Sequence, residues 1–366
     1  MPSVRTSVRT PARSMNASVL MGSQHVTAGY QSCHFQGEKE NLKKAISTEL
    51  YINRVAPSCF SRDHYGRMTP PIPVPFVAGP HVAVRVRGGL TIAGVIGAFG
   101  KSIRLHRLSE PSTGRLLIVP MDHGVTVGPV PGLEDLAARI GEADRGGASA
   151  VVVHKGEVGR YVDASPRRTG LIVHLSVSLT HQPDPDRKVL VGTVEEAVML
   201  GADAVSVHVN IGAATTAEMI ADAGLVAHDC RLLGIPLLVM VYPRGPDIVD
   251  PYDPELVAHC ARAAEEVGAD IIKTNYTGDV DSFTRVVRSV RSPVITAGGP
   301  PSDDPLAPLR QASGTVEAGG AGVACGRNVF QHEDPEAMTR ALASVIFKNA
   351  SPEEAAREHL GGSGGF

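Results

Sequence analysis

The sequence alternates short apolar runs with amphipathic stretches from residue 116 onward. Eight of the runs are largely apolar and mostly rich in β-branched residues, which is typical of strands buried on both faces of a parallel sheet. The runs cover residues 116–121, 150–154, 171–175, 204–209, 236–242, 270–274, 293–297 and 321–325. The pattern therefore predicts eight parallel strands.

Amphipathic segments between most of these runs place apolar residues three and four positions apart, as helices with one buried face do. They cover residues 133–145, 194–200, 216–233, 254–267 and 281–290. Glycine in a Gly-Ala pair just before a strand allows the left-handed cap that ends a helix, and such pairs occupy 147–148, 201–202, 268–269 and 320–321. The polar segment 181–188 contains prolines and predicts a shortened helix in the third crossover.

Eight strand–helix units predict an α/β fold, a (β/α)8 TIM barrel whose parallel strands are joined by right-handed crossovers. An open doubly wound sheet is the alternative. It is less favoured because the first strand lacks a GxGxxG turn and nothing indicates a second mononucleotide-binding half. In a barrel, catalytic residues stand at the C-terminal ends of the strands.

The first 95 residues have no sustained period and carry clusters of Ser, Arg, Pro and Gly, as in Pro70–Pro75. Such segments rarely pack a core. We therefore predict an N-terminal extension over 1–95, disordered or an artefact of the gene start, with a regulatory or targeting arm as the alternative. The barrel is expected over 96–348, starting with a short basic helix at 100–108, and a C-terminal tail over 349–366.

Composition narrows the classes of function. The 366 residues include 35 basic and 38 acidic ones, a formal net charge of -3 that excludes a broadly basic nucleic-acid binder. Five scattered cysteines without a CxxC pair indicate reduced thiols. No stretch approaches the roughly 20 apolar residues that span a bilayer. We expect a cytoplasmic protein with no nucleic-acid or membrane partner.

Lys273, inside the sixth apolar run, is the most informative residue. Lysine is seldom buried, because taking an ammonium out of water is costly. A lysine inside a barrel is therefore paired with a carboxylate, held as a phosphate-binding cation, or active as an amine nucleophile with a lowered pKa. In the last case it condenses with a ketone to an iminium, which makes the neighbouring C–H acidic.

Three further residues at strand ends have candidate roles. Asp122 directly follows the first apolar run, where it is either an acid/base or a helix cap. Tyr242 ends the fifth run and either shuttles protons or packs in the core. Arg244, slightly further out, meets an anion at the barrel mouth or makes a surface salt bridge. Together with Lys273 they suit Schiff-base chemistry on a phosphorylated ketone.

The ends of the last two strands predict a phosphate site. Gly298 and Gly299 follow the seventh run, and Gly326 and Arg327 follow the eighth. Glycine exposes backbone N–H groups, and loops 7 and 8 hold phosphate in many barrels. Arg327 adds a bidentate charge-assisted contact. Either pair alone is more often a plain turn, but the combination favours a phosphate cradle.

Four histidines at strand ends suggest metal binding as an alternative chemistry. Neutral imidazoles that converge at a barrel mouth can bind zinc, which would polarise a carbonyl in place of the iminium. The histidines are His123, His154, His174 and His208. They lack a helical HxxxH or a cysteine partner, so we expect no metal, and roles in binding substrate or orienting catalytic groups.

Four motifs in this order resemble the archaeal-type class I aldolase family, over about residues 100–346. They are MDHG at 121–124, YPRG at 242–245, KTNYTG at 273–278 and GRNVFQ at 326–331. Within the family, the chain is most similar to the 2-amino-3,7-dideoxy-D-threo-hept-6-ulosonate synthases and the related synthases on the way to 3-amino-4-hydroxybenzoate. Fructose-1,6-bisphosphate aldolases of the family often carry an aromatic residue two positions before the tyrosine, where this chain has Met240.

The resemblance implies Lys273 as the Schiff-base lysine, Tyr242 as proton donor and Asp122 as proton acceptor. The implied substrate contacts are His123, Gly124, Val125, Thr126, Pro243, Arg244, Gly298, Gly299, Gly326 and Arg327. It also implies small-molecule substrates, no cofactor beyond the covalent lysine, and a homo-oligomer.

The resemblance further implies a reaction that joins a phosphorylated ketone to L-aspartate 4-semialdehyde. The donor that it implies is either dihydroxyacetone phosphate, towards which the composition leans, or a deoxy-ketohexose phosphate. Two alternatives remain at this stage, a fructose-1,6-bisphosphate aldolase and a catalytically inactive sugar-phosphate sensor.

Overall fold

The computed structural model describes residues 92–164, 166 and 168–361. The predicted extension lies almost entirely outside this part of the chain. No helix within it is both long and apolar enough to cross a membrane.

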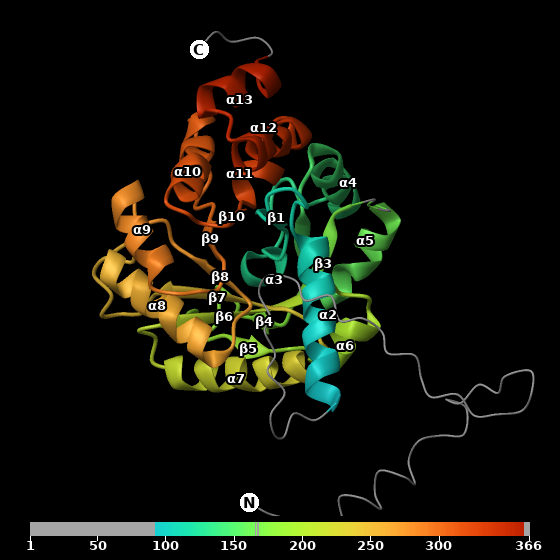
Figure 1. The fold of residues 1–366 in the computed structure, drawn as a ribbon, viewed down its shortest axis with the longest axis vertical. Helices are drawn as coiled ribbons and strands as arrows, with labels where there is room; N and C mark the ends of the chain where they lie inside the picture. Colours follow the sequence, from blue (N-terminus) through green and yellow to red (C-terminus); the bar gives the residue numbers. More distant parts are fainter. Residues whose placement is uncertain (1–91, 165, 167, 362–366) are drawn as a thin grey trace, which may run out of the picture. The chain divides into compact units, whose positions relative to one another are not determined.

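Eight parallel strands close into a barrel, which confirms the predicted TIM barrel and excludes the open sheet (Figure 1). Each predicted strand is present, with ends within two residues of the predicted ones. Around the barrel the order is β1, β10, β9, β8, β7, β6, β3 and β2. The strands are β1 Leu116–Pro120, β2 Ala150–His154, β3 Gly170–His174, β6 Ala204–Ile211, β7 Leu237–Pro243, β8 Ile271–Thr274, β9 Val294–Ala297 and β10 Gly322–Ala324.

Most helices lie between consecutive barrel strands. They are α2 Ile92–Leu108, α3 Gly124–Val127, α4 Leu136–Gly146, α5 Val158–Ala164, α6 Val194–Met199, α7 Thr216–Leu233, α8 Pro254–Val267, α9 Val280–Arg288, α10 Leu306–Glu317, α11 Arg327–Phe330, α12 Pro335–Lys348 and α13 Pro352–His359, with a 3-10 turn η2 at Lys155–Glu157. Helices α3, α5, α10, α11 and α12 were not among the predicted segments, and α13 lies in the predicted tail. The left-handed glycine predicted at Gly320 is instead Gly319, with φ of +87°.

Helix α2 begins earlier than the predicted basic helix and closes the N-terminal end of the barrel. Its Leu108 is fully buried in the cluster of side chains that fills the barrel, and Leu105 packs against that cluster. The Nζ atom of Lys101 makes a 2.6 Å ion pair with Asp270, just before β8. The opposite, C-terminal end is left for the site.

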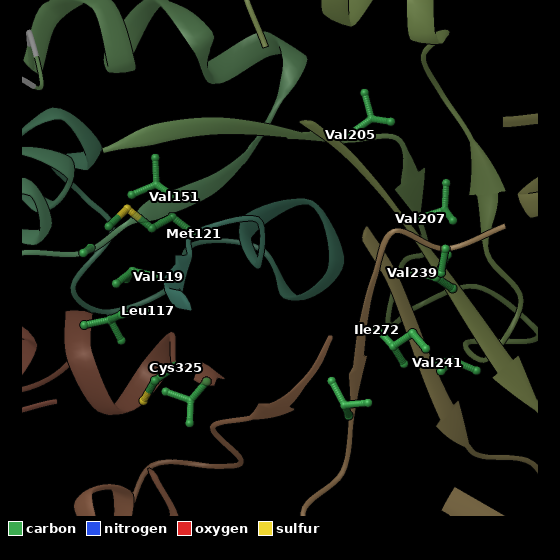
Figure 2. Close-up of a cluster of buried hydrophobic side chains, with 14 of the residues drawn as sticks. Leu117, Val119, Met121, Val151, Val205, Val207, Val239, Val241, Ile272 and Cys325 are labelled. Atoms are coloured by element: carbon green, nitrogen blue, oxygen red, sulfur yellow. The ribbon is translucent and has the colours of Figure 1, made fainter. Parts of the chain in front are cut away.

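Alternation along the strands separates two sets of buried side chains. One set faces outward to the helices and is almost entirely apolar, including Leu117, Val119, Val151, Val239 and Ile272 (Figure 2). The other set fills the barrel and includes Leu238, Met240 and Tyr242 along β7. Within the barrel, polar groups replace apolar ones toward the C-terminal ends of the strands.

A two-stranded antiparallel hairpin interrupts the third crossover, where the sequence predicted only a shortened helix. Strands β4 (Ser176–Val177) and β5 (Val189–Leu190) form it, and the short helix α6 follows. In β6, Asn210 is fully buried, and its Nδ2 donates a 2.7 Å hydrogen bond to the carbonyl of Asp186 in the hairpin loop. The barrel thereby fixes the loop at its mouth.

Candidate active site

A cavity of about 440 Å³ opens at the C-terminal end of the barrel, lined by residues at the ends of all eight strands. Ten of the thirteen predicted site residues line it, namely Asp122, His123, Thr126, Tyr242, Arg244, Lys273, Gly298, Gly299, Gly326 and Arg327. The other three do not. Gly124 and Val125 line a neighbouring cavity, and Pro243 is buried as the last residue of β7.

Lys273 follows Ile271 by two positions on β8, so its side chain points into the barrel. The residue is 8% exposed, and its Nζ lies 4.0 Å from the sulfur of Met240, its neighbour on β7. Among the described residues, no carboxylate oxygen lies within 4.0 Å of this amine. A structural ion pair therefore does not explain the lysine.

Asp122 stands just beyond β1, which is opposite β7 in the ring of strands. Its carboxylate lies 3.8 Å from Nε2 of His174 and 3.7 Å from Nδ1 of His123. Burial alone would raise the pKa of Asp122, but His174, His123 and Lys273 outweigh that effect and hold the pKa well below its usual range. The carboxylate is anionic at neutral pH.

The strand-end histidines are candidate acid/base or positioning groups. Burial lowers the pKa of His174 to about 4, and Asp122 only partly offsets this. The Nδ1 of His174 is 2.8 Å from Oγ of Ser206. His154 donates from Nδ1 to the carbonyl of His174 at 3.2 Å, since a carbonyl only accepts. Alternation along β2, β3 and β6 turns His154, His174 and His208 toward the barrel interior, and all three line the cavity.

Nothing in the described part of the chain groups three His, Cys, Asp or Glu side chains as a metal site. The ring of His208 makes a hydrogen bond to Asn210. The Nδ2 of Asn210 faces a carbonyl, so its Oδ1 faces Nε2 of His208 at 2.8 Å, and that ring nitrogen must donate. Burial holds the pKa of His208 well below its usual value, and the cation of Lys188 lowers it further. The ring is therefore neutral.

Tyr242 is 8% exposed and lines the cavity one strand away from Lys273. The ring of His208 meets it edge-on with centroids 5.1 Å apart. The guanidinium carbon of Arg244 lies 5.8 Å from the centre of the tyrosine ring. No hydrogen bond joins the phenol to any other described residue, so the hydroxyl is available to a ligand.

The loops after β9 and β10 form a surface of bare backbone. A Cβ at Gly298 would come within 2.8 Å of Cys325, and one at Gly326 within 2.7 Å of the Pro120 carbonyl oxygen, so both positions require glycine. Arg327 donates to the Gly299 carbonyl at 3.0 Å, which holds its guanidinium beside this backbone. Asn328 supports the loop by donating to the carbonyls of Gly298 and Pro300. The arrangement suits a phosphate.

Several cavity residues were not predicted as site residues from sequence. They are Ser176, Ser178, Lys188, Tyr252 and Asn275. Lys188 carries the largest chemical consequence, because it adds a second lysine to the cavity wall. Its only sequence signal was its place at the end of the polar segment 181–188.

Comparison with known proteins bears on this site. The profile of the DeoC/LacD family aldolases matches residues 116–332. A 2-amino-4,5-dihydroxy-6-oxo-7-(phosphonooxy)heptanoate synthase from Streptomyces griseus is 44% identical over 268 residues, which are 73% of this chain and 97% of the relative. A 2-amino-3,7-dideoxy-D-threo-hept-6-ulosonate synthase from Halobacterium salinarum is 47% identical over 258 residues, 70% of this chain and 95% of the relative.

Solved structures agree on the fold. An archaeal fructose 1,6-bisphosphate aldolase is 33% identical, with a TM-score of 0.62 over 68% of this chain and 99% of that one. A second structure of an archaeal fructose-1,6-bisphosphate aldolase is also 33% identical, with a TM-score of 0.61 over 67% of this chain and 99% of that one. In that structure the catalytic lysine is covalently bound to the carbinolamine intermediate of the substrate.

Proposed function

The chain belongs to the DeoC/LacD family of class I aldolases, and we propose that it joins a phosphorylated ketone to L-aspartate 4-semialdehyde through a Schiff base on Lys273. Family membership makes it an enzyme, so the alternative of an inactive sensor is dropped. The observation that carries the proposal is the amine of Lys273, buried in the cavity with no carboxylate partner within 4.0 Å in the described chain.

Lys273 acts as the nucleophile. Its free amine attacks the keto carbon of the donor and forms a carbinolamine, and loss of water gives the iminium. The iminium withdraws electrons from the adjacent carbon, which then loses a proton to become an enamine. The enamine attacks the aldehyde carbon of the acceptor, and hydrolysis of the new iminium releases the product and the lysine.

Tyr242 and Asp122 move the protons. They stand on opposite sides of the barrel, since β7 and β1 are opposite each other in the ring. The anionic carboxylate of Asp122 accepts a proton. The unpartnered phenol of Tyr242 donates to the leaving water of the carbinolamine and to the oxygen of the aldehyde as the C–C bond forms.

The backbone of Gly298, Gly299 and Gly326 and the guanidinium of Arg327 bind the phosphate of the donor. Both loops lie on the side of the mouth next to β8, where Lys273 stands. A phosphate held there places the neighbouring keto carbon near the amine. His123 and Thr126 complete the wall on the β1 side.

The choice of substrates rests on the relatives. Both curated relatives described above are named for seven-carbon products with an amino group at carbon 2 and a carboxylate end. One of these products also carries a phosphonooxy group at carbon 7, next to its keto carbon. We therefore propose dihydroxyacetone phosphate as donor, with a deoxy-ketohexose phosphate as the other candidate. The archaeal structures support fructose-1,6-bisphosphate aldolase as the second candidate function.

Product analysis tests the proposal. The enzyme is incubated with dihydroxyacetone phosphate and either L-aspartate 4-semialdehyde or glyceraldehyde 3-phosphate, and products are identified by mass spectrometry. We expect a phosphorylated amino-heptulosonate with the first acceptor at a higher kcat/KM. Faster formation of fructose 1,6-bisphosphate would contradict the proposal.

A further inference from the structure

We propose that Lys188 and Arg244 form a subsite for the carboxylate of the aldehyde acceptor, on the side of the barrel mouth opposite the phosphate-binding glycines. This inference rests on the proposed function, because it assigns the second substrate of that reaction to named side chains. It also adds Lys188, which the sequence did not indicate, to the site.

The hairpin places the ammonium of Lys188 in the cavity wall. Ser176 pairs with Leu190 and Val177 pairs with Val189, so the next antiparallel pair along the register is Ser178 with Lys188. The Nζ of Lys188 donates to Oγ of Ser178, and both residues line the cavity. Ser178 is 2% exposed, which makes this contact part of the packed structure.

The barrel holds the rest of the hairpin loop in place. Asn210 on β6 donates to the carbonyl of Asp186, two residues before Lys188. On the other side, the backbone N–H and the hydroxyl of Thr180 donate to the carbonyl of Thr126 at 2.9 and 2.8 Å. Lys188 therefore lies on a loop anchored at both ends, which is what a specific contact requires.

The charge at this wall lacks a carboxylate partner. In the described chain, no carboxylate oxygen lies within 4.0 Å of Lys188 or of Arg244. Burial lowers the pKa of Lys188 to about 8, the cation of Arg244 acts in the same direction, and Asp186 and Asp122 offset only part of this. Two neighbouring cations, one of them half-buried, are stabilised when an anion binds between them.

The ring of strands places Lys188 across the mouth from the phosphate, and Arg244 directly follows β7, between β6 and β8. Strand β9 is opposite β3, which leads into the hairpin, and β10 is opposite β6. In the product for which the Streptomyces relative is named, the keto group is at carbon 6, the phosphonooxy group at carbon 7 and the carboxylate at carbon 1. With the keto carbon at Lys273 and the phosphate at the glycines, the remaining carbons lead the carboxylate toward Lys188 and Arg244.

A matched set of variants tests the subsite. Lys188→Met removes the cation, and Lys188→Arg keeps it. Lys155→Met is the control, because Lys155 does not line the cavity and makes a 3.0 Å ion pair with Glu196. Each variant is assayed with dihydroxyacetone phosphate and either L-aspartate 4-semialdehyde or butanal, an acceptor of the same length without a carboxylate. Borohydride trapping of the donor on Lys273 checks folding and the donor half of the site.

We expect Lys188→Met to lower kcat/KM for L-aspartate 4-semialdehyde by roughly tenfold or more, because a hydrogen bond to a charged group is lost. Its kcat/KM for butanal and its yield of trapped donor should stay within about twofold of wild type. Lys188→Arg should retain most of the preference for the carboxylated aldehyde, and Lys155→Met all of it.

Several outcomes would overturn the subsite while leaving the proposed function intact. One is an equal loss for butanal, another is no loss for either aldehyde, and a third is loss of the trapped donor in Lys188→Met. A larger loss for glyceraldehyde 3-phosphate than for L-aspartate 4-semialdehyde would make Lys188 a phosphate contact instead. A wild-type enzyme that neither traps dihydroxyacetone phosphate nor uses L-aspartate 4-semialdehyde would overturn both proposals.

Discussion

The two sides of the barrel mouth present charge to a ligand by different means. On the β9 and β10 side, the surface is backbone from three glycines, with Arg327 held beside it by the Gly299 carbonyl. On the β3 and β6 side, the surface consists of the side chains of Lys188, Ser178 and His208. Lys273 stands between them on β8.

This difference explains why the glycines could be predicted from the sequence and Lys188 could not. Bare backbone requires glycine at fixed positions, because any side chain at Gly298 or Gly326 would collide with its neighbours. Such a requirement is visible in a sequence. Lys188 depends on the register of a hairpin and on a hydrogen bond from Asn210 to Asp186, contacts that no local pattern reveals.

The largest expected effect comes from removing the amine of Lys273, which lies between the two sides of the mouth. Lys273→Met should abolish turnover with every donor and acceptor, since no iminium can form. Steady-state assays check the activity, and thermal unfolding by circular dichroism checks that the barrel remains folded. Retained activity in a folded variant would contradict the Schiff-base mechanism.

Tyr242→Phe should have the next largest effect and should act on both substrates. Loss of the phenol removes a proton donor, for which a decrease in kcat of about a hundredfold is typical. Borohydride trapping of the donor should be slower in this variant but should still succeed, because the phenol also donates to the leaving water of the carbinolamine while Lys273 is intact. An unchanged kcat would contradict Tyr242 as the proton donor.

Arg327→Ala should affect the β9 and β10 side alone. We expect KM for the phosphorylated donor to rise roughly tenfold or more, because one charge-assisted contact is lost. Unphosphorylated dihydroxyacetone is the control donor, and its KM should not change. An equal change in KM for both donors would refute a phosphate contact. A changed preference between the aldehydes would show that Arg327, like Lys188, acts on the acceptor.

The smallest expected effect lies outside the mouth. Ser351 caps α13 by accepting from the backbone N–H of Glu354, whose carboxylate accepts from the backbone N–H of Ser351 in return. Ser351→Ala should lower the free energy of unfolding by about 1 kcal/mol. Urea denaturation measures that loss, and kcat/KM for both substrates should match wild type. Altered kinetics would show that the outer helices and the mouth are coupled.

The strands were predictable because residues buried on both faces leave continuous β-branched runs. Helices were harder to predict where tertiary packing outweighs helix propensity. Helix α10 contains Gly314, which is unfavourable inside a helix, yet a side chain at this position would collide with the Tyr276 hydroxyl. Close packing against that tyrosine therefore accounts for a glycine that obscures the helical pattern.

The candidate site was predictable where it follows the strand period. Lys273 lies inside an apolar run, Tyr242 ends one and Asp122 directly follows one, so their place at the mouth follows from the fold. The inward orientation of His154 and His208 follows from alternation once the strand is placed. Gly124 and Val125, which the resemblance implied as substrate contacts, line a neighbouring cavity at the start of α3.

Reductive trapping of the donor on the enzyme is the decisive test of a Schiff base on Lys273. The protein is incubated with dihydroxyacetone phosphate and borohydride, with and without EDTA, and digested, and the modified residue is mapped by mass spectrometry. A Schiff-base mechanism on Lys273 predicts one reduced adduct on this lysine, in equal yield with and without EDTA. An adduct on another lysine, or no adduct in an enzyme whose turnover EDTA abolishes, would contradict it.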